Sequence, residues 1–178
     1  MQKKQKGLVW FRNDLRVHDN ESLANAINEN NTVIAVYCFD PRHFEKTGFG
    51  FKKTEKFRAK FLIESVKALK QNLEKLNIPL LVYHQKPEDA IQEITAESEI
   101  SAIYFQEEWT KEEMEVLENI KANVPDSVLF KSTYNQFLFH PDTIPFEIAK
   151  IPNVFTQFRN QCEKIDENPT GIYSSAGF

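Results

Sequence analysis

GLVWF at residues 7–11 and TVIAVYCF at residues 32–39 are short apolar runs rich in β-branched and aromatic residues. Runs of this kind are typical of strands that are buried on both faces of a parallel sheet. Between them, the side chain of Asp19 or Asn20 can cap a helix in which apolar residues recur at helical spacing. A strand, a helix and a second strand in this order predict two parallel strands joined by a right-handed crossover.

The same alternation continues along the chain. We expect further strands at residues 78–83, 101–105 and 128–130, with helices at residues 54–77, from near Pro87 and from Thr110. Strands that alternate with helices predict an α/β fold with a doubly wound, five-stranded parallel sheet and helices on both faces, which is Rossmann-like.

The sequence predicts an apolar face for one of these helices and a capping motif for another. The helix at residues 54–77 has one apolar stripe, at Phe57, Phe61, Leu62, Val66, Leu69, Leu73 and Leu76. The helix that starts at Thr110 has Glu113 at capping-box spacing. A stripe of this kind is typical of an amphipathic helix.

Ligands of doubly wound sheets bind at the carboxyl ends of the strands. The loops that follow the first, second and fourth predicted strands are residues 12–18, 40–53 and 106–109. These loops are therefore the candidate functional segments.

Composition limits the function. The chain has 178 residues and a formal net charge of −4, so it is not expected to bind nucleic acid as a whole. Any such contact requires a local basic patch or another domain. No apolar run is long enough to cross a membrane, and Cys38 and Cys162 lie far apart, so we expect a cytoplasmic protein with no membrane partner. The four histidines show no metal-ligand spacing, and no metal site is predicted.

Several motifs occur in the order of a known family. They are WFRNDLRVHDN at residues 10–20, YCFDPRHF at 37–44, GFGFKKTEKFRAKFLIESV at 48–66, EEWTKEE at 107–113 and PNVFTQFRNQCEKI at 152–165. Together they resemble the N-terminal domain of the DNA photolyase and cryptochrome family, and most of all its DASH branch. The resemblance implies an α/β antenna domain at residues 7–135. It further implies that residues 136–178 are a linker toward an absent helical FAD-binding domain, ending in a mobile tail.

The resemblance also implies a function. Members of the family repair cyclobutane pyrimidine dimers or sense blue light, with FAD in the helical domain and an antenna chromophore, commonly methenyltetrahydrofolate, held with the help of the α/β domain. We therefore expect a light-harvesting domain that has no catalytic residue of its own. DNA and FAD would be bound through the parent protein only.

The family places a carboxylate against the pterin ring of the folate. Glu113 or Glu108 is the candidate here, followed by Glu112, with Gln106 at the end of the preceding strand. A carboxylate suits this role because it accepts two parallel hydrogen bonds from an amino-pyrimidinone edge. The alternative is that these glutamates only face the positive end of the helix dipole.

The loop at residues 49–53 lies in the same region of the family. Phe51 could cover the pterin face, and Lys53 or Lys52 could meet the acidic tail of the folate. The alternative is that Phe51 packs within its own loop and that the lysines are solvated.

Two other interpretations remain open. Arg12, Asp14 and Arg16 follow the first strand, where they either fix the turn as an Arg–Asp network or contact a ligand. The domain could also be a stand-alone nucleotide-binding or dimerising module, although it contains no GxGxxG or GKS/GKT phosphate loop. Phenylalanines near the end of the chain, from Phe137 to Phe158, are core or loop packing when read alone. The family resemblance implies instead that some of them lie under the absent helical domain and leave an apolar patch prone to self-association.

Overall fold

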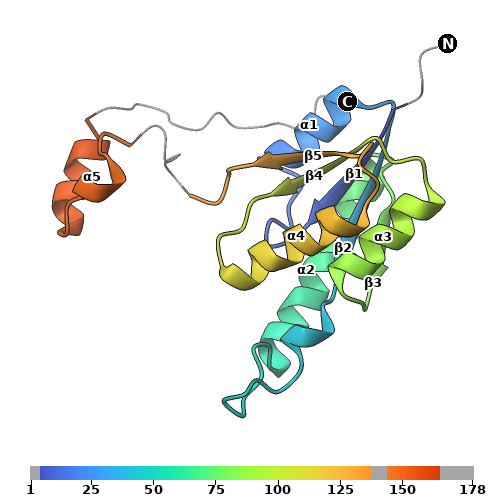
Figure 1. Ribbon diagram of the computed structural model, residues 1–178, viewed down its shortest axis with the longest axis horizontal. Helices are drawn as coiled ribbons and strands as arrows, with labels where there is room; N and C mark the ends of the chain where they lie inside the picture. The colour runs from blue at the N-terminus through green and yellow to red at the C-terminus, as the bar shows by residue number, and fades with distance from the viewer. Residues whose placement is uncertain (1–4, 138–143, 165–178) are drawn as a thin grey trace.

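The computed structural model describes residues 5–137 and 144–164. Its centre is a five-stranded parallel sheet in the order β3-β2-β1-β4-β5 (Figure 1). The strands are β1 (Lys6–Phe11), β2 (Thr32–Cys38), β3 (Leu80–Tyr83), β4 (Ala102–Gln106) and β5 (Leu129–Thr133). All four pairings are parallel, which confirms the predicted Rossmann-like sheet.

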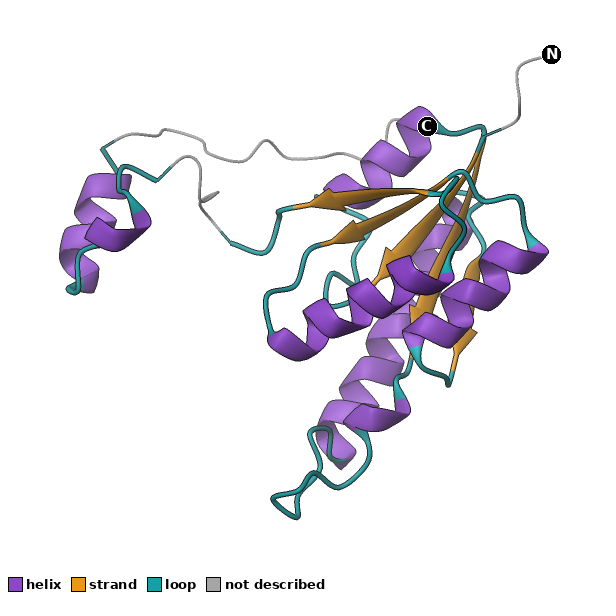
Figure 2. Ribbon diagram, viewed as in Figure 1, coloured by secondary structure: helices purple, strands orange, loops and turns teal. Residues whose placement is uncertain are grey.

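Helices cover both faces of the sheet (Figure 2). They are α1 (Glu21–Glu29) and α2 (Lys56–Lys75) on one face and α3 (Pro87–Glu97) and α4 (Lys111–Asn123) on the other. The chain also forms α5 (Phe155–Cys162), which belongs to neither layer, and short 3-10 helices η1 (Pro41–His43) and η3 (Ile148–Lys150). Alternate residues of β1 enter two separate cores: Val9 packs with α1 and α2, and Leu8 packs with α3 and α4. Two covered faces explain why β1 is almost continuously apolar.

Helix starts follow the capping signals. Asn20, rather than Asp19, caps α1, because its side chain accepts the backbone N–H of Leu23 at 2.9 Å. Thr110 caps α4 by accepting the N–H of Glu113. The Glu113 carboxylate does not complete a capping box, since it pairs with Arg12 instead.

The apolar stripe of α2 is buried over only part of its length. Val66, Leu69 and Leu73 pack against the sheet, whereas Phe57 and Phe61 are 85% and 67% exposed. The reason is geometric: β3 is only four residues long, and the first half of α2 extends past the carboxyl end of the sheet (Figure 1). The stripe is continuous in the sequence, but these two phenylalanines at its start remain exposed.

In the C-terminal part of the chain, β5 is longer than the predicted strand and a further helix is present. β5 extends to Thr133, three residues beyond the predicted strand. Past residue 145, where the sequence shows no clear periodicity, residues 155–162 form α5. The tail predicted to be mobile, residues 167–178, lies outside the described residues. Within the described part, no helix is long and apolar enough to cross a bilayer.

Candidate functional site

The order in which strands are added to the sheet reverses between β1 and β4. The chain builds β1, β2 and β3 in one direction and then returns to place β4 on the other side of β1. At such a switch point the two flanking loops separate and leave a crevice at the carboxyl ends of the strands. A cavity of about 670 Å³ lies there, lined by residues that follow β1, β2 and β4 and by the first turns of α2 and α4. Its size is within the range of small-molecule sites, roughly 300–1,000 Å³.

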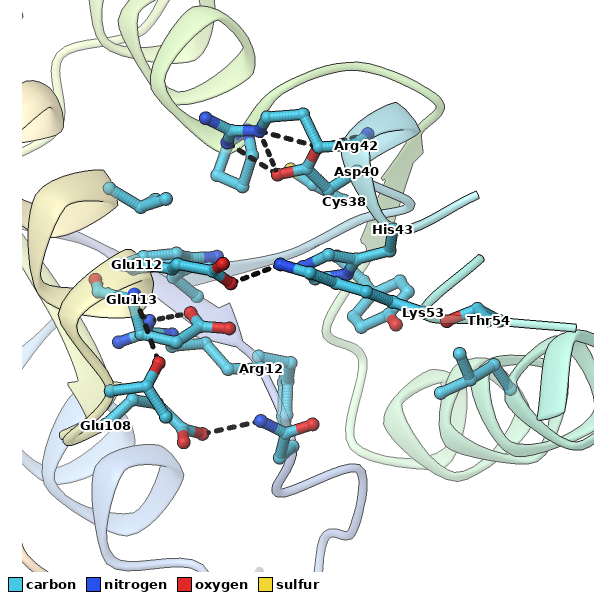
Figure 3. A pocket seen from close by; sticks show the side chains of 18 of the residues that line it. Arg12, Cys38, Asp40, Arg42, His43, Lys53, Thr54, Glu108, Glu112 and Glu113 are labelled. Carbon is cyan, nitrogen blue, oxygen red and sulfur yellow. Dashed lines mark hydrogen bonds and ion pairs between the residues drawn. The ribbon is translucent and has the colours of Figure 1, made fainter. Parts of the chain in front are cut away.

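Arg12 forms the wall between β1 and α4. Its guanidinium is buried, pairs with the Glu113 carboxylate, donates to the Glu113 carbonyl at 3.3 Å and lies 4.4 Å from the centre of the Trp10 ring. These contacts place Glu113 at the cavity with one carboxylate oxygen held by the protein (Figure 3). The other oxygen, Oε1, has no hydrogen bond to the described residues.

The turn after β1 is fixed differently from the expected Arg–Asp network. The buried Asp14 carboxylate accepts the backbone N–H of Arg12 at 2.9 Å and the side-chain amide of Asn20 at 3.1 Å. Arg16 donates to the backbone carbonyl of Asp19 at 3.0 Å. The turn therefore depends on an Asp–Asn contact, which frees Arg12 to reach α4.

Glu108 lines the same cavity, but both of its oxygens are occupied. Asn13 donates to Oε1 at 2.9 Å and Gln136 donates to Oε2 at 2.8 Å. A ligand would have to displace one of these amides. Glu107 points elsewhere, because its carboxylate accepts the Ser132 hydroxyl at 2.5 Å and it is not part of the lining.

Lys53 and Glu112 meet across the mouth of the cavity. They form an ion pair between the loop before α2 and the first turn of α4 (Figure 3). The hydrogen bond from Lys53, followed by its charge, lowers the pKa of the Glu112 carboxyl. The pair joins two residues that the sequence predicted separately as ligand contacts.

Two predicted site residues lie outside the cavity lining. Gln106 is buried at the end of β4, and Phe51 is 63% exposed with its ring stacked on Phe49 at 6.2 Å between centroids. The structure thus brings Glu108, Glu112, Glu113 and Lys53 together and leaves Gln106 and Phe51 apart from them.

A charged cluster on the other side of the cavity was not predicted from the sequence. Arg42 donates two hydrogen bonds to Glu88, at 2.9 and 3.0 Å, and also bonds the buried Asp40. Burial acts to raise the pKa of Asp40, but the hydrogen bonds and charge of Arg42 outweigh it, and the pKa is lowered. The signal was present in the DPRH sequence, since Asp before Pro is a common helix start and Asp40 caps η1.

Two buried side chains on β2 close the floor of the cavity. Burial raises the pKa of the Tyr37 hydroxyl and of the Cys38 thiol, each to about 12. Both groups are therefore neutral at ordinary pH. Within residues 5–137 and 144–164, no group of three His, Cys, Asp or Glu side chains is arranged to hold a metal ion.

The family model for DNA photolyase matches residues 7–171. The chain belongs to the DNA photolyase family.

Within the photolyase family, the chain is similar to the DASH cryptochromes. Cryptochrome DASH of Gloeobacter violaceus is 48% identical over 158 residues, which make up 88% of this chain and 32% of that protein. Cryptochrome DASH of Synechocystis is 41% identical over 158 residues, which again make up 88% of this chain and 32% of that protein. These matches confirm the predicted resemblance to the DASH branch.

Solved structures of photolyase relatives agree in fold. A crystal structure of a Synechocystis cryptochrome superposes with a TM-score of 0.89 at 37% identity, over 98% of this chain and 37% of that one. An archaeal photolyase from Sulfolobus tokodaii, whose crystal structure is described with two FAD molecules and an implied novel light-harvesting cofactor, superposes with a TM-score of 0.78 at 25% identity. This match covers 96% of this chain and 37% of that one. The chain spans about a third of the length of these relatives.

Proposed function

We propose that this domain holds a folate-type antenna chromophore, methenyltetrahydrofolate, in the cavity at the β1/β4 switch point. The observation that carries the proposal is the position of Glu113 on the cavity wall, oriented by Arg12 through one oxygen and open through the other. The parent protein would be a DASH-like blue-light flavoprotein that repairs cyclobutane pyrimidine dimers or senses light.

The donors around the cavity fit such a group. A pterin presents an amino-pyrimidinone edge with two parallel N–H donors. The open Oε1 of Glu113 can accept one of them, and Oε2 can accept the other through its second lone pair, beside the bond from Arg12. The folate tail ends in carboxylates, and Lys53 and Arg58 also line the cavity. A volume of about 670 Å³ accommodates a molecule of drug size.

Among the three candidate carboxylates, Glu113 is favoured. Glu108 has both oxygens bonded to side-chain amides, and Glu112 is engaged by Lys53. Glu113 and Glu112 each keep one oxygen without a partner among the described residues, but the Glu113 side chain is only 26% exposed, whereas that of Glu112 is 70% exposed. Release of the Lys53–Glu112 pair would then open the mouth of the cavity and leave Lys53 to meet the folate tail.

When bound, the chromophore would absorb near-ultraviolet light and transfer the excitation to a flavin. The chain would contribute a site that does not react with it. The methenyl carbon of this folate is electrophilic and is open to attack by thiolates. Cys38 lines the cavity, but its raised pKa of about 12 keeps the thiol protonated and poorly nucleophilic.

The chain covers about a third of the length of its relatives, which supports assigning the remaining roles to a second domain of the parent protein. We assign residues 7–135 to the antenna domain and residues 136–178 to the link toward a helical FAD-binding domain. On this proposal FAD, the electron transfer and the contact with a pyrimidine dimer belong to that second domain. The chain by itself would have no lyase activity.

An absorbance titration with methenyltetrahydrofolate tests the proposal. Wild type should give a saturable shift of the near-ultraviolet band, and Glu113→Gln should weaken binding by about tenfold or more, because a charge-assisted hydrogen bond is lost. Glu108→Gln should change affinity less than about threefold, and Glu107→Gln, which lies outside the cavity, serves as the matched control.

The outcomes separate this proposal from the nucleotide-binding alternative. Far-ultraviolet circular dichroism establishes that each variant is folded before titration. A folded wild type that gives no saturable shift contradicts antenna binding by this chain. A rise in melting temperature with nucleotide, but not with folate, would favour the nucleotide module instead.

A further inference from the structure

Three aromatic rings form an exposed group on the loops that follow β4 and β5. The centre of the Tyr134 ring lies 4.7 Å from that of Trp109 and 6.0 Å from that of Phe137. Trp109 and Phe137 are 44% and 53% exposed. None of the three belongs to the cavity lining. We refer to Trp109, Tyr134 and Phe137 as the aromatic platform.

The platform is held in place by the two loops themselves. The Glu107 N–H donates to the Thr133 carbonyl at 2.9 Å, and the Ser132 hydroxyl donates to the Glu107 carboxylate at 2.5 Å. Because these bonds fix the loops before any partner arrives, binding to the platform costs little further ordering.

Two hydrogen-bond donors of these loops lack acceptors. The side-chain amide nitrogen of Asn135, the residue after Tyr134, is buried and has no partner among the described residues. The indole N–H of Trp109 likewise donates no hydrogen bond within residues 5–137 and 144–164. A buried donor without an acceptor is costly, and native structures keep few of them. Asn135 as a whole is half-buried, so a rotation of its side chain brings the amide to a carbonyl oxygen supplied from outside.

Residues 150–155, between η3 and the first residue of α5, present the complementary groups. Their exposed large apolar side chains are Ile151, Val154 and Phe155, at 39%, 54% and 74%. The carbonyls of Ile151 and Pro152 accept no hydrogen bond from the described residues. An irregular segment with a proline offers both apolar side chains and free carbonyls to an aromatic surface. We refer to residues 150–155 as the apolar segment.

Charges of opposite sign surround the two surfaces. Residues 107–118, which include Trp109, contain six glutamates and one lysine, whereas residues 150–164 contain two lysines, one arginine and one glutamate. Opposite charges favour encounter of the two surfaces and fix their orientation. The same glutamates oppose the approach of anionic lipid, and they oppose the pairing of one platform with another.

The apolar segment stands away from the domain that carries the platform. Figure 1 shows α5 well apart from the sheet. The stretch of chain between Phe137 and Lys150 is long enough to span up to about 45 Å. The segment can therefore reach the platform of a neighbouring molecule.

We propose that the aromatic platform binds the apolar segment of a second copy of this chain. Reciprocal exchange of the segment between two copies gives a closed, two-fold symmetric dimer that contains the same contact twice. Each contact covers exposed rings with Ile151, Val154 and Phe155 and supplies backbone carbonyls to the two free donors. Association through exposed apolar side chains of this size is expected of a surface that is otherwise left in water.

Sedimentation equilibrium of the whole chain at about 1–200 µM tests the proposal. We expect reversible dimers that dissociate on dilution, with no larger species, because both sites of a closed dimer are used. Tryptophan emission should shift to shorter wavelength on association, since the exposed indole of Trp109 leaves water whereas Trp10 is already buried. A rise in salt should weaken the dimer, because the charges around the contact are opposite and exposed.

Substitutions on each surface identify the contact. Trp109→Ala and Phe155→Ser should each weaken dimerisation by about tenfold or more, since each removes a large side chain from both contacts. Phe57→Ser is the matched control, because Phe57 is 85% exposed on α2, and it should leave the dimer unchanged. Far-ultraviolet circular dichroism establishes that each variant is folded.

A mixture of the two variants tests which surface meets which. The Trp109→Ala chain keeps an intact apolar segment, and the Phe155→Ser chain keeps an intact platform. A mixed dimer therefore contains one complete contact, whereas neither variant alone contains any. Sedimentation of the mixture should show more dimer than either variant alone at the same total concentration.

Four results would overturn the proposal. They are a monomer at every concentration, a dimer that survives both substitutions, a mixture that associates no better than its components, and a dimer that depends on Phe57. A monomer whose tryptophan emission shifts to longer wavelength in Phe155→Ser would place the contact within one chain and also contradict the dimer. Folate titration of the same proteins reports separately on the chromophore cavity, which contains neither Trp109 nor Phe155.

Discussion

Arg12 and Glu113, which are 101 residues apart in the chain, form an ion pair that joins the end of β1 to the first turn of α4. The pair spans the switch point of the sheet. Among the described residues, the loops after β1 and β4 share no backbone–backbone hydrogen bond there. It therefore contributes both to stability and to the position of a half-buried carboxylate that keeps an open oxygen at the cavity.

Replacement of Arg12 by Met should destabilise the domain by about 2 kcal/mol. The arginine is only 8% exposed, and its loss leaves a partly buried carboxylate without a partner. Urea denaturation followed by circular dichroism measures the change. The exposed pair of Lys111 and Glu115 is the control, and Lys111→Gln should cost less than about 0.5 kcal/mol. Equal effects for the two substitutions would contradict a special role for Arg12.

The two halves of α2 should respond differently to truncation. Leu73→Ala removes a fully buried side chain and should cost about 2–5 kcal/mol, whereas Phe57→Ala should cost less than about 0.5 kcal/mol. Thermal or urea denaturation of both variants checks the difference. If Phe57→Ala were as costly as Leu73→Ala, the first half of the helix would have to be packed rather than exposed.

Asp40 should make stability depend on acid pH. Its folded-state pKa lies below the ordinary value of 3.8 for an aspartate, so its stabilisation is present above about pH 4 and is lost as the pH falls through the folded pKa. Asp40→Asn should cost about 2 kcal/mol near pH 7. The gap between wild type and variant should narrow below pH 4, as measured by urea midpoints across a pH series. A constant gap would show that Asp40 acts without its charge.

Cys38 should resist alkylation in the folded protein. A thiol with a pKa raised from 9.0 to about 12 has roughly a thousandfold less thiolate at pH 8. Iodoacetamide labelling followed by peptide mass spectrometry should therefore be slow at Cys38 in buffer and fast in concentrated urea. Rapid labelling of the native protein would show that the thiol is ionised, and would remove the argument that the cavity floor is unreactive.

Much of the fold follows from local patterns. The apolar runs at residues 7–11 and 32–39 predicted buried strands, and the structure has β1 and β2 there. Capping chemistry identified the starts of α1 and α4, because Asn and Thr side chains satisfy free N–H groups within three residues. Signals of this kind depend on neighbours in sequence, which is why they can be read without a structure.

The features that could not be predicted depend on the relative lengths of helices and strands and on contacts between segments far apart in the sequence. The stripe of seven apolar residues between positions 57 and 76 looks uniform in the sequence. The short β3, of four residues, leaves Phe57 beyond the end of the sheet and exposed. Similarly, the Thr110 and Glu113 spacing suggested a capping box, but Arg12 arrives from the far end of the sequence and takes the carboxylate. The link between Arg42 and Glu88, 46 residues apart, is of the same type.

The strand order has a consequence for synthesis on the ribosome. β1 lies at the centre of the sheet, yet its partner β4 follows about 95 residues later in the chain. At roughly 5–20 residues per second, one edge of the nascent β1 waits about 5–20 s for the strand that will cover it. During that interval an apolar strand edge is open to other chains, so we expect a nascent-chain chaperone to be needed most before residue 106 emerges.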